Sequence, residues 1–304
     1  MNRNVLLVAL ACLLPITAGC GSETKVQPSA TASTLGTSAP KSAGNKKFII
    51  DANESMVKFV MDAPSEKIRG RIASATSGDL FIDPTDLTAT TGTIAVDLDK
   101  LELFQRVKGD EDKDYGEEKK SPAQNDHAKN WLELVTNDTV NKEARDKNAR
   151  SEYKISSIVS ASEKDITKLK GAERTVQITA KGDFLLHGRT EKDKEVKLDV
   201  TFKLDGDKIT SVKIKPSKTV DLELKTFKIE PKDAAGSILQ KGFDLFGKKV
   251  ANVAPVEFEI IAKPDGMPLS TTPPPPDPVA APAGSGSAAA SAAPSASAAP
   301  SAKP

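Results

Sequence analysis

The sequence predicts a mainly all-β domain in which neighbouring strands run antiparallel. Apolar and polar residues alternate without a fault over residues 196–204, and a similar alternation runs through 176–186. A period of two is typical of strands that bury one face and leave the other in water. Turn residues separate the runs, and Asp205-Gly206-Asp207 predicts a short hairpin connection.

Further alternating runs lie at 94–98, 220–224 and 256–260. We therefore expect roughly nine or ten strands, which must avoid open edges by closing into a barrel or by packing as a two-sheet sandwich. Alternation by itself leaves both architectures open. A closed barrel of about eight strands would have room for one small ligand in its lumen.

Helices are predicted to be few. Residues 122–135 are expected to form a short helix with Asn125 or Asp126 as its N-cap. The apolar face of this helix would carry Ala128, Trp131, Leu132 and Val135.

Polar segments flank this helix. Residues 106–120 are almost entirely charged and residues 136–150 are polar as well, so both are predicted to be solvated loops. A second short helix is predicted over 233–246, although Gly236 and Gly242 lower its helix propensity.

Composition divides the chain into four parts. Residues 1–19 are predicted to be a signal peptide, and residues 20–46 a flexible tether of small and polar residues. Residues 47–263 hold nearly all the large apolar side chains and form the predicted domain. Residues 264–304 are rich in Pro, Ala and Ser, which predicts a disordered tail that is partly polyproline-like.

The signal peptide is interpreted as that of a bacterial lipoprotein. One positive charge precedes an apolar run over residues 5–16, which is too short to span a bilayer. The run ends in Thr17-Ala18-Gly19-Cys20, which resembles the Leu-Ala-Gly-Cys of lipoprotein signals with Thr17 in place of leucine. By that resemblance, Cys20 would carry thioether-linked lipid and an acyl chain. The alternative is an ordinary secretory peptide that is cut near Ala18.

Cysteine and charge content exclude several classes of function. The two cysteines are Cys12 and Cys20, and Cys12 lies in the predicted signal, so the mature chain can form neither a disulfide nor a thiolate metal site. A net charge of +1 and an aromatic content of 4% disfavour nucleic-acid binding. After the signal, no apolar run approaches the length of a membrane helix.

Several segments, taken in order, resemble the YceI-like family of secreted lipid binders. The most specific is 180–190, Ala-Lys-Gly-Asp-Phe-Leu-Leu-His-Gly-Arg-Thr, which is similar to the family's Gly-x-Leu-Thr-x-His-Gly-x-Thr. Residues 47–59 resemble its opening strand pair, 68–72 its Val-x-Gly-x-Phe step, and 77–84 its Ser-Gly-x-Ile-x-x-Asp-Pro hairpin. The segment Asn125-Asp126-His127 is similar to the family's Arg-Asp-x-His-Leu. The resemblance covers about residues 47–263.

The resemblance implies an antiparallel, lipocalin-like β-barrel that binds a polyisoprenoid or a similar long-chain lipid. Three departures leave the ligand less defined than the fold. Glu54 stands where the family often has His, and Asn125 stands where it has Arg. The charged segment 106–120 enlarges a loop near the expected mouth, where its lysines would meet the lipid head group.

The apolar stripes of the strands are the candidate site. In a filled barrel or sandwich they would be plain core, whereas in the lipocalin-like barrel that the resemblance implies they would line a tube for an acyl or isoprenoid chain. The small residues Ala180 and Gly182 are expected to leave space beside Phe184. The predicted lumen residues are Phe59, Ile94, Val96, Ile178, Ala180, Gly182, Phe184, Val200, Phe202, Leu222 and Phe258.

No catalytic constellation is found, and the protein is not expected to be an enzyme. The only histidines, His127 and His187, lack the spacing of a metal pair and are interpreted as a helix N-terminal residue and a turn-stabilising residue. The carboxylate run 110–114 lacks the central Gly and distal Glu of a calcium loop. No cofactor and no metal are expected; the ligand would be an isoprenoid or fatty-acyl lipid.

The sequence therefore predicts a lipid-anchored, periplasm-facing protein that holds a long-chain amphiphile in its barrel. The alternative is a structural or interaction lipoprotein with a filled barrel, whose Pro-rich tail binds partners or cell-wall components. Gly21 after Cys20 is not the Asp that resembles an inner-membrane retention signal, so the outer membrane is favoured. No protein partner is indicated by the sequence.

Overall fold

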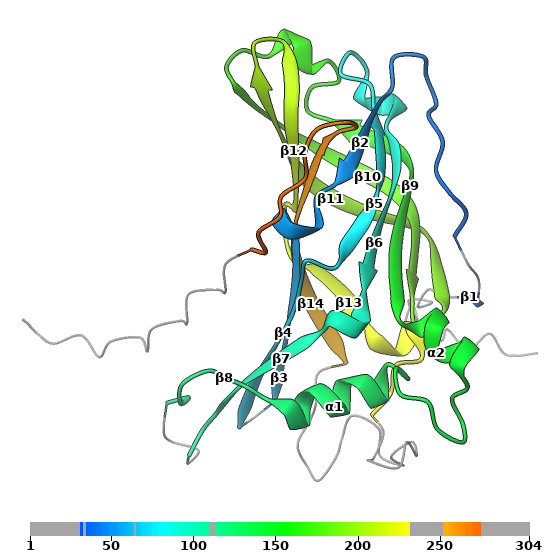
Figure 1. Ribbon diagram of the computed structural model, residues 1–304, viewed down its shortest axis with the longest axis vertical. Coiled ribbons are helices and arrows are strands. Elements are labelled where there is room, and N and C mark those ends of the chain that lie inside the picture. The colour runs from blue at the N-terminus through cyan, green and yellow to red at the C-terminus, as the bar shows by residue number, and fades with distance from the viewer. Residues whose placement is uncertain (1–30, 33–34, 64, 110–113, 232–251, 275–304) are drawn as a thin grey trace, which may run out of the picture.

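Eight antiparallel strands close on themselves to form a barrel, which stands upright in Figure 1. The computed structural model describes residues 31–32, 35–63, 65–109, 114–231 and 252–274. The ring runs in the order β14, β2, β5, β6, β9, β10, β11, β12 and back to β14, where Ile214 pairs with Ile260 and closes the sheet. The strands are β2 (Lys46–Ile50), β5 (Thr76–Ile82), β6 (Thr91–Asp97), β9 (Arg150–Ala161), β10 (Glu173–Leu186), β11 (Arg189–Asp205), β12 (Lys208–Pro216) and β14 (Val253–Pro264).

Four of these strands are interrupted and then continue into the lower half of the molecule, the end at which α1 lies in Figure 1. There the sheet has the order β13, β14, β3, β4, β7, β8. Its remaining strands are β3 (Met56–Ala63), β4 (Glu66–Ala73), β7 (Glu102–Val107), β8 (Lys119–Lys120) and β13 (Val220–Glu223). Short 3-10 turns are η1 (Ala52–Glu54), η2 (Leu87–Ala89), η3 (Leu98–Lys100), η4 (Ile166–Lys168) and η5 (Leu224–Phe227). The barrel therefore has an upper and a lower half that different strand segments enclose.

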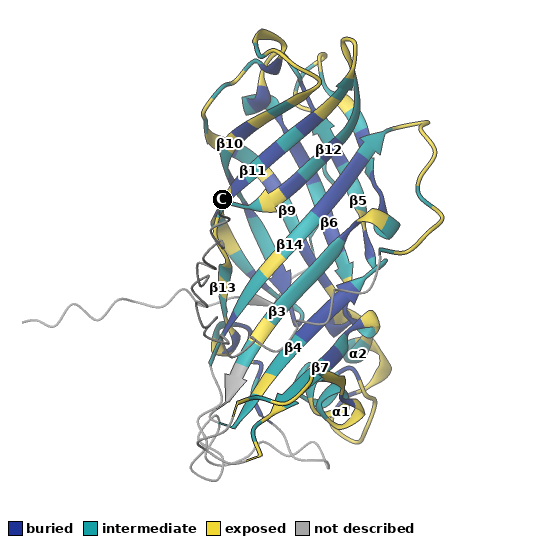
Figure 2. Ribbon diagram, turned by 90° about the vertical axis from the view of Figure 1, so that its left-hand side faces the viewer, coloured by how far each residue is buried: buried dark blue, intermediate teal, exposed yellow. Residues whose placement is uncertain are grey.

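The helix α1 (Pro122–Trp131) runs across the lower end, as both Figure 1 and Figure 2 show. Its N-cap is Ser121, whose side chain accepts a hydrogen bond from the Gln124 N–H, so the prediction of Asn125 or Asp126 as the cap is wrong. Pro122 explains the earlier start, because proline favours the first helical position. The helix also ends before 135, and Val135 is exposed rather than part of the apolar face.

Both polar segments beside α1 contain regular structure that was not predicted. Lys142–Asn148 forms the helix α2, which starts at an Asn141 N-cap and carries a Glu143–Lys147 ion pair one turn apart. It has no apolar periodicity, the pattern from which an amphipathic helix is predicted, so the sequence predicts a loop here. The segment 106–120 is also more than a loop, because it contains the end of β7 and the whole of β8, whose Lys119 and Lys120 pair with Gln105 and Phe104. The predicted helix over 233–246 lies outside the described residues.

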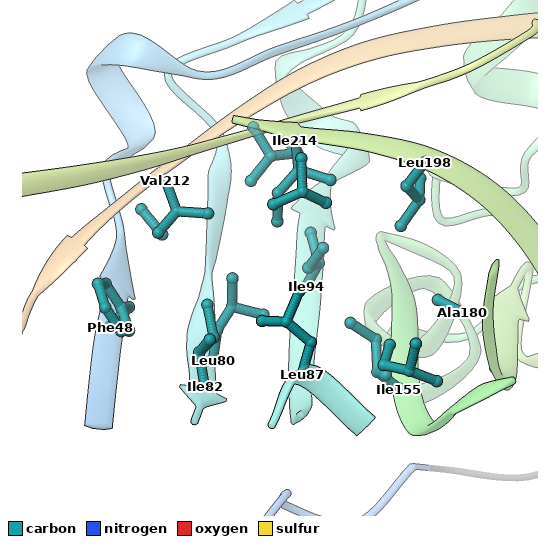
Figure 3. Close-up of a cluster of buried hydrophobic side chains, with 14 of the residues drawn as sticks. Phe48, Leu80, Ile82, Leu87, Ile94, Ile155, Ala180, Leu198, Val212 and Ile214 are labelled. Carbon is teal, nitrogen blue, oxygen red and sulfur yellow. The ribbon is translucent and has the colours of Figure 1, made fainter. Parts of the chain in front are cut away.

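The upper half is filled by side chains. Along 196–204 the even positions face inward, as predicted, and the hairpin between β11 and β12 is confirmed by pairing of Asp205 with Lys208. Figure 3 shows apolar side chains from the surrounding strands meeting across this half. We call this set the upper core; its most buried large members, each no more than 1% exposed, are Phe48, Leu80, Ile166, Val176, Phe202, Val212 and Ile260.

Segments outside 47–263 also contact the barrel. In the predicted tether, the Ser42 hydroxyl donates to Asp83 at 2.8 Å, and β1 (Thr31–Ala32) pairs with β11. In the predicted tail, the Ser270 N–H donates to Asp51 at 2.7 Å. These parts of the tether and tail are therefore attached to the barrel by hydrogen bonds. None of the helices in the described part of the chain has the length and apolar character needed to cross a membrane.

Candidate functional site

The lower half encloses a cavity of about 610 Å³. Its wall is formed by β3, β4, β13 and one face of α1, by parts of β6, β7, β9, β10, β11 and β14, and by η3 and η5. Phe59, Met61 and Ile68 point into it from β3 and β4, while Trp131 and Leu132 reach it from α1 and its C-cap. This volume lies in the range of small-molecule sites, and an apolar wall of this kind is typical of them.

The predicted lumen residues divide between the two halves. Six of them line the cavity: Phe59, Ile94, Val96, Phe184, Leu222 and Phe258. The other five are not in its wall: Ile178, Ala180, Gly182, Val200 and Phe202. Ala180, Val200 and Phe202 belong to the upper core and Ile178 packs against it, so they occupy filled space. The two readings that alternation left open, filled core and ligand tube, thus each describe one half of the barrel.

Gly182 is expected to leave space beside Phe184, but the structure gives another reason for a glycine at this position. A Cβ at this position would lie 2.2 Å from the carbonyl oxygen of Lys154 on the neighbouring strand β9. The β9–β10 register also shifts between Lys181 and Gly182. Close approach of two backbones therefore demands glycine here, as is common at bulges.

Sequence reasoning missed the contribution of α1 to the cavity. Gln124, His127, Ala128 and Trp131 line it. The sequence predicts the apolar face of this helix but does not indicate which surface that face covers. Conversely, no described residue of 106–120 lines the cavity. The predicted contact between lysines of that segment and a head group is therefore not seen in the wall.

Polar groups inside the cavity already have protein partners. The Tyr153 hydroxyl lies 3.0 Å from the carbonyl oxygen of Ala180 and 2.9 Å from that of Lys194, and it donates its proton to them. Burial raises the pKa of Tyr153 well above its usual range, and the charge of Glu195 adds to the effect, so the hydroxyl stays a donor. The Lys194 ammonium is 2.8 Å from a Glu191 carboxylate oxygen.

Two further polar wall residues are paired in the same way. The Ser151 hydroxyl donates to the carbonyl oxygen of Leu185 at 2.9 Å, and the Glu152 carboxylate accepts from Arg150. A ligand deep in the cavity would thus meet apolar surface and polar groups that are already satisfied. Such a wall suits a hydrocarbon chain.

The α1 end of the cavity is its polar end. The Glu66 carboxylate accepts a hydrogen bond of 3.2 Å from the Gln124 side chain. His127, one turn further along α1, is exposed to solvent while it also lines the cavity. This combination places an opening to solvent beside His127.

His187 lies outside the cavity wall and is buried. Its Nδ1 lies 2.9 Å from the carbonyl oxygen of Phe227, which ties the β10–β11 turn to η5. The backbone of His187 is left-handed, with φ of 51°. Its predicted structural role is thus served by a contact to a distant segment. The described residues contain no group of three metal-binding side chains, and residues 110–113 of the carboxylate run lie outside them.

Comparison with known proteins identifies the fold family. The model of the YceI-like domain matches residues 48–262. The chain belongs to the YceI-like family. This confirms the resemblance inferred from segments such as 180–190, and YceI-like domains are binding domains.

Among solved structures, this YceI-like chain is similar to a polyisoprenoid-binding domain from Saccharophagus degradans implicated in plant cell wall breakdown. The two share 14% sequence identity with a TM-score of 0.43, over 71% of this chain and 98% of that one. None of the curated proteins compared with the chain matches it.

Proposed function

We propose that this YceI-like protein is a lipid-anchored, periplasm-facing binding protein that holds the chain of a polyisoprenoid or similar amphiphile in its lower cavity. The observation that carries the proposal is the cavity of about 610 Å³, whose wall is apolar and whose deep polar groups are already hydrogen-bonded. Burial of hydrocarbon contributes about 0.8 kcal/mol per methylene, so a long chain needs few polar contacts.

Trp131 offers a direct test, because it is the single tryptophan of the chain and lines the cavity. Titration with geranylgeraniol is expected to change its fluorescence in a saturable way, since the lipid replaces water around the indole. The Trp131→Phe variant should lose the signal, while lipid in organic extracts of that variant should still be found by mass spectrometry. A wild type without a saturable change and without extractable lipid would favour the interaction protein instead.

The proposed anchor would bring the cavity close to a membrane. β1 pairs with Arg189 and Thr190 of β11, next to the turn at Gly188 and beside α2 at the lower end. The chain from Cys20 to Thr31 can span at most about 38 Å, at about 3.5 Å per residue. A lipid on Cys20 would therefore keep Thr31, which lies at the lower end of the barrel, within that distance of the bilayer.

The anchor itself is tested by Cys20→Ser. We expect this variant to lose lipid-dependent processing and to move from the detergent phase to the aqueous phase, because stable attachment needs the chains that a lipidated cysteine carries. Membrane fractionation with detergent partitioning measures the change. Gly21→Asp serves as a matched control that keeps the cysteine and tests the proposed outer-membrane location. Wild-type protein in the aqueous phase would contradict the lipoprotein interpretation.

A further inference from the structure

The cavity is closed at the level where the two halves of the barrel meet. Six residues line the cavity and also belong to the upper core or pack against it: Val57, Ile94, Tyr153, Val220, Phe258 and Ile260. We call this set the floor of the cavity; it closes the end of the cavity that faces the upper core, opposite α1. Tyr153 of β9 is held in the floor by its hydroxyl, which donates to carbonyl groups on β10 and β11.

Above the floor, the described side chains of the upper core are almost completely buried. Phe48 and Phe202 are each 1% exposed, and Val212 and Ala180 are 0% exposed. These side chains come from different strands and belong to one cluster of buried apolar residues, of which Figure 3 labels Phe48, Ala180 and Val212. A chain that enters beside His127 can therefore advance only as far as the floor, because a filled interior accepts extra methylenes only at the expense of strain.

The volume then limits the length of the buried chain. A water molecule in a liquid occupies about 30 Å³, and a methylene is of similar size, so about 610 Å³ corresponds to roughly 20 carbon atoms. From this geometry we propose that the protein buries at most about 20 carbons of a lipid chain, so that affinity rises with chain length only up to that point. Longer chains gain nothing, because their remaining carbons stay in solvent at the α1 end.

This proposal rests on the proposed function, and a length series tests it. The full-length protein is titrated with straight-chain primary alcohols of about 12 to 26 carbons, delivered from cyclodextrin, with Trp131 fluorescence as the readout. Affinity is expected to rise with chain length, by up to about fourfold per methylene, and to level off near 20 carbons. A continued rise to the longest alcohols would overturn the floor, whereas failure of every alcohol and of geranylgeraniol to bind would overturn the proposed function as well.

A matched pair of variants distinguishes an effect of the floor on the chain-length limit from an effect of general destabilisation of the barrel. Ile94 is 9% exposed and belongs to the floor, whereas Ile214 is 4% exposed and lies in the upper core away from the cavity wall; both are labelled in Figure 3. Ile94→Ala removes three carbon atoms from the floor, so its length limit should move up by about two carbons. Ile214→Ala makes the same truncation and should keep the wild-type limit. If Ile94→Ala is folded and its chain-length limit equals that of the wild type, the assignment of the floor is contradicted.

Discussion

Replacement of Phe202 by alanine is expected to lower the free energy of unfolding by about 3–5 kcal/mol, the usual cost of truncating a buried Phe. Phe202 is 1% exposed and packs within the upper core, so its loss leaves a cavity that neighbouring strands cannot refill. Equilibrium urea denaturation measures the change. Enlargement is also expected to be harmful, with Phe202→Trp costing about 1–3 kcal/mol through overpacking.

Phe184→Ala is the matched control, because Phe184 lines the cavity. Its ring packs edge-on against Phe227 at 5.4 Å between centroids, but the space beside it is already hollow. We expect a smaller loss, about 1–2 kcal/mol, from partial burial and the aromatic pair. Lipid affinity should fall in Phe184→Ala and remain near wild type in folded Phe202→Ala. A loss of stability at Phe184 as large as that at Phe202 would contradict the division into a filled and a hollow half.

Replacement of Asp51 by asparagine is expected to lower the free energy of unfolding at pH 7 by about 1.5–3 kcal/mol, the scale of a hydrogen bond to a charged group. The Asp51 side chain is 1% exposed and receives Lys263 at 2.7 Å and the Ser270 N–H at 2.7 Å. In Asp51→Asn, the side-chain NH2 group is a hydrogen-bond donor, and it would face the Lys263 ammonium and the Ser270 N–H, which are donors as well. Glu54→Gln is the control, since Glu54 also contacts Lys263 but is 42% exposed and should cost less than about 1 kcal/mol.

The effect of Asp51 should depend on pH in a defined direction. Burial alone would raise the pKa of Asp51, but the hydrogen bonds from Lys263, Ser270 and Asn53 outweigh it and lower the pKa below its usual range. The contribution of the carboxylate is therefore fully present above the unfolded-state pKa of about 3.9 and is lost as pH falls through the lower folded-state pKa. The stability difference between wild type and Asp51→Asn should be constant from pH 7 to about pH 5 and shrink below about pH 4. A difference that persists unchanged at pH 2 would show that charge is not its cause.

The sequence by itself determined which face of each strand is apolar, because a period of two follows from the pleat of a single strand. Alternation such as that at 196–204 predicts the strands, and the ordered set of segments that resemble the YceI-like family, 180–190 among them, predicts the barrel. Local sequence patterns predict helix positions less well where packing or an N-cap residue determines the helix. The helix α2 has no apolar face, and Ser121, the N-cap of α1, lies one residue before the predicted helix over 122–135.

Only the tertiary structure decided which apolar side chains fill the barrel and which surround a cavity. Phe184 and Phe202 occupy similar positions in alternating runs, yet one lines the cavity and the other lies in the upper core. Alternation predicts that a side chain is buried. Whether other side chains fill the space across the barrel from it depends on strands that are far away in the sequence. The breaks after β2, β4, β6 and β12, the bulges in β10 and the position of α1 together produce a filled upper half above a hollow lower half.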